Sequence, residues 1–297
     1  MTTTVLVTGA SGGIGGHLLT ALAGRDVTVR ALVRDPDRLA GAGAGVGVEV
    51  VRGDLRDPGA VAAALHGVDA AFLNSPSAPD AATTQIAVAD AAATAGVNRL
   101  VLLSQFAARA DSPVRFLRWH AAVEQHVRNL GIGHVVLRPN LFLQGLLAFA
   151  PLVAATGRFG TPIGDAAVSA IDVRDIADAA AAVLTGAGSD GVVHDLTGPR
   201  AVTHAEIAAA LAEATGHPVS FDDLTPEAFA AALDGVLPPW QAAGLVEDYA
   251  HYARGEAARV DDAVAVLTGH PARTLEEFAR DHAAAFAPAG PSAQTFT

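Results

Sequence analysis

Short apolar runs of strand length alternate with Ala-rich stretches of helical spacing along the first half of the chain. The apolar runs predict strands at Val5–Thr8, Val27–Val33, Val48–Arg52, Ala70–Leu73, Leu100–Ser104 and His134–Leu137. Helical spacing lies between them, at residues 14–23, 58–66, 80–95 and 115–130. Apolar strands without a polar alternation are typical of a parallel sheet that helices cover on both faces. We expect an α/β fold with a doubly wound parallel sheet.

The pattern changes after Leu137. An apolar helix or loop is expected over residues 141–155, a helix over 172–184 and a short strand over 192–196. Helical spacing then dominates, at 203–215, 225–233, 242–255 and 274–285, with a break at residues 238–240. Thr203 and Glu206 have the spacing of a capping box. This half predicts a smaller, mainly helical lobe over the carboxyl ends of the strands, where ligands bind in such sheets.

A glycine-rich turn joins the first predicted strand to the first helix. Gly9, Gly12 and Gly15 have the spacing GxxGxxG. Glycines here allow a tight turn and a close approach of the backbone to a pyrophosphate, which the start of the following helix stabilises. A glycine triplet also suits an ordinary turn, but its place between strand and helix favours dinucleotide binding. The expected contacts are Thr8, Gly9, Ser11, Gly12, Gly13, Ile14 and Gly15.

The end of the second predicted strand bears on which dinucleotide binds. An NAD site usually has Asp or Glu there, which accepts hydrogen bonds from the ribose hydroxyls. Here Arg34 stands at the strand end, with Arg30 inside the strand and Arg38 after it. A guanidinium can bind a 2′-phosphate through two hydrogen bonds. We expect NADP(H) in preference to NAD(H); the alternative is that Arg34 is only a solvated charge at a strand end.

Composition narrows the class of protein. The chain of 297 residues is half apolar, which allows a large core, and its formal net charge is −12. A surface of that sign disfavours direct binding of nucleic acid. Cys is absent, which excludes disulfides and thiolate chemistry. Because no leader segment and no bilayer-spanning run is evident, we expect a cytoplasmic protein that does not bind a membrane. We also expect no metal ion, and a monomer or homodimer.

Several motifs together resemble one family. They are TGASGGIGG (8–16), ALVRDP (31–36), VRGDL (51–55), LRPNLFLQGLL (137–147), IDVRDIADAAAAVL (171–184) and GHPARTLEEFARD (269–281). With them the chain is similar to atypical short-chain dehydrogenases/reductases, and more narrowly to the NmrA-like and NAD(P)H:quinone-oxidoreductase-like family. The resemblance spans nearly the whole chain and implies a Rossmann fold.

We expect residues 1–140 to form the NADP-binding core with 169–196 packing back onto it, residues 141–168 and 197–287 the substrate lobe, and 288–297 a flexible tail. The resemblance implies further cofactor contacts. Cofactor contacts would come from the strand ends, at Asp54, Leu55, Asn74, Ser75, Pro76, Ser104, Gln105, Pro139, Asn140 and Phe142. Each of these positions taken alone is also compatible with an ordinary turn.

One departure from the larger family concerns the proton donor. Typical short-chain reductases use Tyr-x-x-x-Lys, in which Lys lowers the pKa of Tyr. This chain has no Lys, and its two tyrosines, Tyr249 and Tyr252, lie in the second half. In the helix predicted over residues 115–130, His120 falls on the apolar stripe and is the catalytic candidate. A core-edge histidine is the alternative. Glu124 is expected on the helix flank, as a solvated charge or an ion-pair partner rather than as a catalyst.

Three functions fit these features. The first is an NADPH-dependent reductase of a flat quinone or aromatic carbonyl compound, with Phe106, Trp119 and Phe142 as candidates for the substrate pocket. Quinone reduction tolerates the missing Tyr–Lys pair because the ring of the hydroquinone anion stabilises its charge. The second is an NADP(H)-sensing regulatory protein that turns nothing over. The third is a tailoring enzyme of aromatic polyketide biosynthesis.

Overall fold

The chain folds into two compact units. The computed structural model describes residues 2–40 and 47–288. The first unit comprises Met1–Asn140, Val173–Thr197 and Asp261–Ala272, and the second Leu141–Asp172, Gly198–Val260 and Arg273–Thr297. The return to the first unit thus begins at Val173 rather than at residue 169. Apart from residue 288, the tail expected over 288–297 lies outside the described residues.

Residues 261–272 were expected in the substrate lobe, and that assignment is wrong. They belong to the first unit, where α11 (Ala263–Thr268) packs against the helix α7 (Val173–Leu184). Val264 and Leu267 of α11 are buried. The Thr197 hydroxyl also accepts a hydrogen bond from the backbone N–H of Asp261 at 3.0 Å. Burial of these two apolar side chains stabilises the segment against the first unit, although its neighbours on both sides in the sequence belong to the second unit.

The first unit is built on a seven-stranded sheet in the order β3-β2-β1-β4-β5-β6-β8, and each neighbouring pair is parallel. The strands are β1 (Thr3–Thr8), β2 (Val27–Val33), β3 (Val48–Arg52), β4 (Ala70–Leu73), β5 (Arg99–Leu103), β6 (Gly133–Pro139) and β8 (Val192–Leu196). The strand order reverses between β1 and β4, which is where ligands bind in doubly wound folds. The α/β fold expected from the sequence is confirmed.

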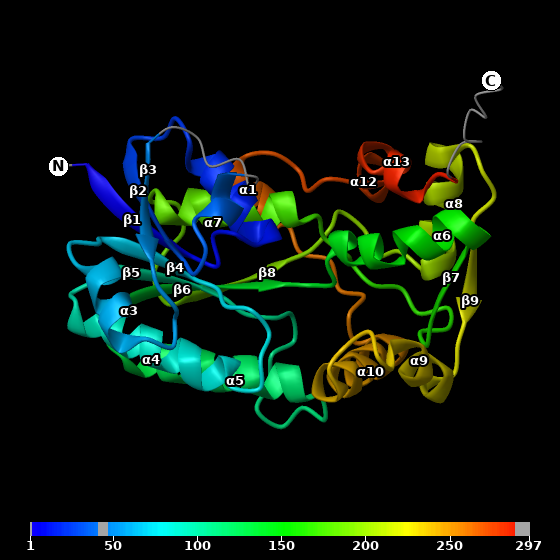
Figure 1. Cartoon of the computed structure of the whole chain (residues 1–297), viewed down its shortest axis with the longest axis horizontal. Helices are drawn as coiled ribbons and strands as arrows, with labels where there is room; N and C mark the ends of the chain where they lie inside the picture. The colour runs from blue at the N-terminus through cyan, green and yellow to red at the C-terminus, as the bar shows by residue number, and fades with distance from the viewer. Residues whose placement is uncertain (1, 41–46, 289–297) are drawn as a thin grey trace, which may run out of the picture. The chain divides into compact units, whose positions relative to one another are not determined.

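Helices cover both faces of this sheet (Figure 1). One face carries α1 (Gly13–Leu22) and α7, which pack against each other. The other face carries α3 (Pro58–Leu65), α4 (Ala81–Thr94) and α5 (Arg115–Asn129), which pack in that order. The short helix α2 (Asp37–Ala40) follows β2. Apolar side chains of α3, α4, α5 and the strands form one buried cluster, and this burial holds the layers together.

The second unit is mainly helical. Its elements are the 3₁₀ helix η1 (Leu143–Phe149), α6 (Ala150–Thr156), β7 (Arg158–Thr161), α8 (His204–Thr215), β9 (Ser220–Asp223), α9 (Pro226–Leu233), α10 (Pro239–Ala253), α12 (Leu275–Asp281) and α13 (Ala283–Phe286). The expected break at residues 238–240 is the start of α10, because proline is tolerated in the first helical turn. The single helix expected over 274–285 is divided at His282 into α12 and α13.

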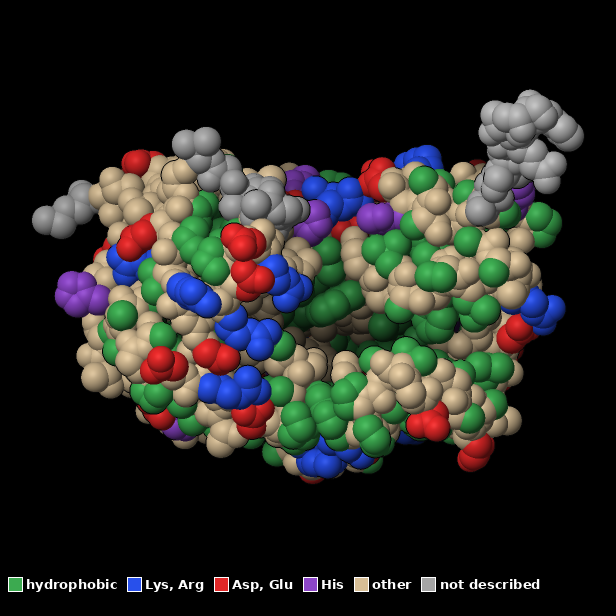
Figure 2. Space-filling model, viewed as in Figure 1, with side chains coloured by type: hydrophobic (Ala, Val, Ile, Leu, Met, Phe, Trp, Pro, Cys, Tyr) green, Lys and Arg blue, Asp and Glu red, His purple; other side chains and the backbone are tan. Residues whose placement is uncertain are grey.

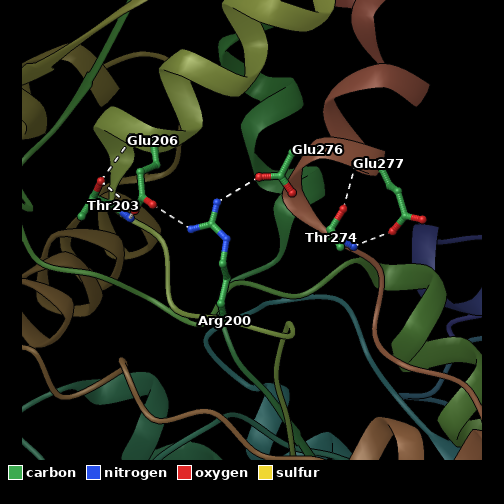
Figure 3. Close-up of polar contacts among 6 residues, drawn as sticks. All are labelled: Arg200, Thr203, Glu206, Thr274, Glu276 and Glu277. Carbon is green, nitrogen blue, oxygen red and sulfur yellow. Dashed lines mark hydrogen bonds and ion pairs between the residues drawn. The ribbon is translucent and has the colours of Figure 1, made fainter.

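Arg200 links the starts of two helices in the second unit (Figure 3). Its guanidinium donates to Glu206 of α8 at 2.8 Å and to Glu276 of α12 at 2.9 Å. The capping box expected at Thr203 and Glu206 is present, and α12 begins with a second one. Both boxes satisfy backbone N–H groups that have no partner inside the helix.

The described residues include no helix long and apolar enough to cross a membrane. On the face of the molecule that Figure 2 shows, basic and acidic side chains lie interspersed over the first unit.

Candidate cofactor site and active site

The glycine loop between β1 and α1 has the geometry of a phosphate-binding turn. Gly9 has φ +65°, a conformation that favours glycine, and its carbonyl accepts from the N–H of Gly12 at 3.0 Å. A Cβ on Gly15 would lie 2.2 Å from the carbonyl oxygen of Gly9, so the helix can pack this closely only with glycine there. A Cβ on Gly13 would meet no atom within 4 Å. The backbone at the start of α1 is therefore open to a ligand, and these residues fit a dinucleotide.

Thr8 joins the loop to the end of β4. Its hydroxyl oxygen lies 2.7 Å from the Asn74 carbonyl oxygen and accepts from the Asn74 N–H at 2.9 Å. A Cβ on Gly9 would lie 3.0 Å from the side-chain amide of Asn74. Thr8, Gly9 and Asn74, all expected cofactor contacts, are thus brought together where the strand order reverses. Thr8 itself is buried, so its side chain supports the loop.

The segment after β4 has a support that the sequence analysis missed. Gln85 of α4 is buried, and its side-chain amide donates to the Ser75 hydroxyl at 2.8 Å. The remaining oxygen of the Gln85 amide is buried with no hydrogen-bond partner among the described residues. An uncharged glutamine on a helix has no recognisable pattern in the sequence, so only the contact across to Ser75 reveals it.

Three arginines lie at or just after the ends of β2 and β3. Arg34 follows Val33, which pairs with Arg52 in the register of the two strands. The side chains of Arg34, Arg38 and Arg52 are exposed, and none of them makes an ion pair or hydrogen bond within the described residues. Arg30 differs, because Glu49 and the carbonyl oxygens of two residues occupy its guanidinium. Arg52 was not expected at this site; its position follows from the strand register.

The loop after β3 holds the two residues expected near the adenine. The Asp54 carboxylate accepts from the backbone N–H of Arg56 at 2.9 Å, which shapes the turn. Leu55 is partly buried and packs against the core cluster of the first unit. Both residues therefore have structural contacts of their own.

Glu124 is the centre of a buried ionic network and does not lie on the helix flank. Its side chain is 1% exposed. One carboxylate oxygen accepts from the Ser104 hydroxyl at 2.6 Å and from Nε of Arg138 at 2.7 Å. The other accepts from Arg138 and from Arg128, each at 2.6 Å. The expected ion-pair role is right and the expected location is wrong, since β5 and β6 supply partners that no helical pattern reveals.

His120 lies one turn before Glu124 on α5, as the spacing predicts. It is partly buried, and its ring makes no hydrogen bond to any residue in the described ranges. Burial lowers the pKa of His120 to about 4; Glu124 opposes this shift and Arg138 adds to it. The ring is therefore neutral at physiological pH, with one N–H donor and one acceptor nitrogen.

The other expected pocket residues are distributed over both units. In the first unit, Phe106 is buried and its N–H donates to the Pro139 carbonyl at 2.9 Å, and the N–H of Asn140 donates to Leu196. Trp119 is partly buried and packs edge-on against Phe116 at 5.3 Å. Ser11, Ile14, Pro76 and Gln105 lie in the loops or helix starts at the carboxyl ends of β1, β4 and β5. Phe142 belongs to the second unit, where its backbone bridges to Ile171.

Both tyrosines are buried in the second unit. Tyr249 is 4% exposed and packs edge-on against Phe229 at 5.0 Å and Tyr252 at 5.6 Å. Burial raises the pKa of Tyr249. No group of three His, Cys, Asp or Glu side chains in the described part of the chain is arranged to hold a metal ion.

Comparison with known proteins decides the family. The model of the NmrA-like family matches residues 1–279. The chain belongs to this family. This NmrA-like protein is 39% identical over 283 residues to an NAD(P)H azoreductase of Xenophilus azovorans, which covers 95% of this chain and 99% of that protein. It is also 39% identical over 287 residues to the (4-alkanoyl-5-oxo-2,5-dihydrofuran-3-yl)methyl phosphate reductase of Streptomyces griseus, over 96% and 99% of the two chains.

A solved structure agrees with this assignment. The NmrA-like chain is similar to the NADPH-dependent quinone oxidoreductase QOR2 of Escherichia coli in complex with NADPH. The TM-score is 0.85 at 30% identity, over 93% of this chain and 99% of that one. The family resemblance expected from the motifs is confirmed.

Proposed function

We propose that this NmrA-like protein is an NADPH-dependent oxidoreductase that acts on a flat quinone or aromatic carbonyl compound. The observation that carries the proposal is the glycine loop at the reversal of strand order, with α1 open to a ligand and Gly15 in contact with the loop backbone. The substrate class is supported by the names of the relatives, which include an azoreductase and a quinone oxidoreductase. An azo compound is therefore a further substrate to test.

The preference for NADPH rests on the arginines at the ends of β2 and β3. Arg34, Arg38 and Arg52 have no carboxylate partner in the described residues, so their donors are available to a 2′-phosphate. An NAD site would instead present a carboxylate to the ribose hydroxyls. Asp35 follows Arg34, but its carboxylate accepts from the backbone N–H of Asp37 at 3.1 Å and shapes the start of α2.

The side chains of the site bind and orient more than they transfer protons. Bound NADPH would supply the hydride. A neutral His120 can donate one hydrogen bond to an oxygen or nitrogen of the substrate but does not carry a second proton at neutral pH. Glu124 cannot act as a base, because its oxygens already accept four hydrogen bonds. Such a site suits an acceptor whose reduced form is stable as an anion until solvent protonates it.

The activity test follows the loss of reduced-nicotinamide absorbance with purified protein, NADPH and a panel of quinones, azo dyes and aryl ketones. Turnover of at least one class is expected. Gly15→Val serves as the control, because its side chain would displace the loop backbone and should abolish both binding and turnover. Tight binding of NADPH with no oxidation across the panel would overturn the reductase and favour a regulatory protein that senses NADP(H).

A second experiment tests the cofactor preference. Arg34→Ala should weaken NADPH binding by about tenfold or more and leave NADH binding nearly unchanged, since only NADPH carries the 2′-phosphate. Arg25→Ala is the matched control, because Arg25 is an exposed arginine just before the opposite end of β2. Equal losses for both cofactors in Arg34→Ala would refute the preference.

A further inference from the structure

Glu124 has no hydrogen-bonding capacity left. An ionised carboxylate offers about four acceptor positions. Two of them, on one oxygen, are used by the Ser104 hydroxyl and Nε of Arg138, and two on the other oxygen by Arg138 and Arg128. The residue is 0% exposed, so water does not compete for these positions. The carboxylate is thus fixed in its orientation.

The polarity of Ser104 follows from that fixed carboxylate. A serine hydroxyl has one proton to donate and two lone pairs to accept with. Its proton is directed to Glu124 at 2.6 Å, a distance typical of a charge-assisted O–H···O⁻ bond. No residue in the described ranges donates to the Ser104 oxygen. Toward a ligand, Ser104 can therefore act only as a hydrogen-bond acceptor.

Ser104 directly follows β5, at the carboxyl ends of the strands, where ligands bind in this fold. The loop that continues from it contains Ala107 with φ +60°, an uncommon conformation for a residue other than glycine. A backbone held in this way is often found at ligand sites. The Ser104 N–H donates to the Leu137 carbonyl at 2.8 Å, so the hydroxyl oxygen is the side-chain group of Ser104 that can still accept a hydrogen bond.

We infer that Glu124 is a positioning residue that holds Ser104 as an acceptor for the carboxamide N–H of the nicotinamide ring. The inference rests on the proposed function, because it requires a nicotinamide cofactor. The carboxamide offers two N–H donors, whereas a ketone in its place offers none. The acetylpyridine analogue of NADPH, in which a methyl group replaces the amide nitrogen, lacks these donors, and the comparison with Ser104→Ala isolates the contribution of Ser104. Loss of one such hydrogen bond corresponds to about a fivefold to tenfold weaker affinity.

Glu124→Gln tests the inference because it can reverse the direction of the hydrogen bond between Ser104 and residue 124 while it keeps the shape of the side chain. With the amide nitrogen toward Ser104, one arginine donor faces it; with the nitrogen toward the other side, two arginine donors face it. The orientation with the amide nitrogen toward Ser104 is therefore favoured. Ser104 then accepts a hydrogen bond from Gln, and its own hydroxyl proton no longer points toward residue 124. The hydroxyl proton is then free to be donated to a carbonyl oxygen, which NADPH and its acetylpyridine analogue both carry, so the ratio of their affinities falls toward one.

The experiment measures the dissociation constants of NADPH and its acetylpyridine analogue by fluorescence titration, without substrate. Wild-type protein should favour NADPH by about fivefold to tenfold. Ser104→Ala and Glu124→Gln should each bring the ratio close to one. Arg128→Met is the matched control: Arg128 binds the same carboxylate but not Ser104, so this variant should keep the ratio even if its stability falls.

Each result bears on the inference. A wild-type ratio near one, or an unchanged ratio in Ser104→Ala, would overturn it. If only Ser104→Ala loses the preference, Ser104 contacts the cofactor but Glu124 does not set its polarity, and the inference is again wrong. Loss of the preference in Arg128→Met would mean a general effect of the network and would contradict the specific role. Failure of wild-type protein to bind NADPH would overturn the proposed function and this inference with it.

Discussion

His204 should make the second unit sensitive to mild acid. It lies at the start of α8 with 0% exposure, among the rings of Phe159, Phe221 and Tyr249 at 6.2, 5.3 and 6.0 Å. Neither ring nitrogen has a hydrogen-bond partner within the described residues. Burial lowers the pKa of His204 to about 4 from 6.5. The perturbation to test is a fall in pH from 7.5 to 5, compared between wild-type protein and His204→Phe.

The change in the free energy of unfolding with pH follows from the difference between the pKa of His204 in the folded and unfolded chain. Because the folded-state pKa lies below the unfolded value, the unfolded chain binds this proton first, and stability is lost as pH falls from about 6.5 toward 4. A shift of 2.5 pKa units corresponds to about 3 kcal/mol at full protonation of both states, and about 2 kcal/mol of it is lost by pH 5. Phenylalanine keeps the ring in the aromatic cluster but removes the titration.

The assay is urea unfolding at pH 7.5 and pH 5, followed by tyrosine and tryptophan fluorescence and circular dichroism. The free energy of unfolding of His204→Phe should exceed that of wild type by about 2 kcal/mol more at pH 5 than at pH 7.5. His217→Gln, a change at an exposed histidine of the same unit, should follow wild type. Parallel losses of stability in wild type and His204→Phe would refute the assignment of acid sensitivity to His204.

Three shorter predictions follow. Gly15→Ala should abolish NADPH binding in a fluorescence titration, because its Cβ would lie 2.2 Å from the Gly9 carbonyl oxygen; retained affinity would contradict this geometry. His120→Ala should lower kcat by about tenfold or more with little change in NADPH affinity. Because the pKa of His120 is about 4, the activity of wild-type protein should show no step from His120 between pH 8 and 5. Arg200→Ala should cost less than about 1 kcal/mol in urea unfolding, because its side chain is 44% exposed.

The sheet of the first unit could be predicted because its strands are short segments rich in Val, Leu and Ala between helical stretches. Val27–Val33, Val48–Arg52 and Ala70–Leu73 were expected with the bounds that the structure has. The two-stranded sheet of β7 and β9 was missed. Its strands read RFGT and SFDD, only four residues each and largely polar, so they carry no strand signal of their own. They pair because the helices around them bring the two segments together.

In the candidate site, too, local motifs could be predicted and contacts between distant residues could not. The glycine loop is a local motif, and the structure brings Thr8, Gly9 and Asn74 together. The buried face of α5 was only partly predicted, because the apolar stripe contained His120 while the buried residues include Glu124. A charged residue reads as solvent-facing until its partners are known. Two of those partners, Ser104 just after β5 and Arg138 in β6, lie 20 and 14 residues away in the sequence.

The polar groups of α5 together limit the chemistry that the proposed reductase can perform. A chain without Lys cannot lower the pKa of a tyrosine in the usual way, and both tyrosines are buried in the second unit. His120 is neutral near pH 7, and Glu124 and Ser104 are committed to each other. None of these groups can deliver a proton in step with hydride transfer. Simple aliphatic ketones need that proton, because an alkoxide is too basic to leave the site unprotonated, whereas a hydroquinone anion does not. Quinones should therefore be reduced, and unactivated ketones should not.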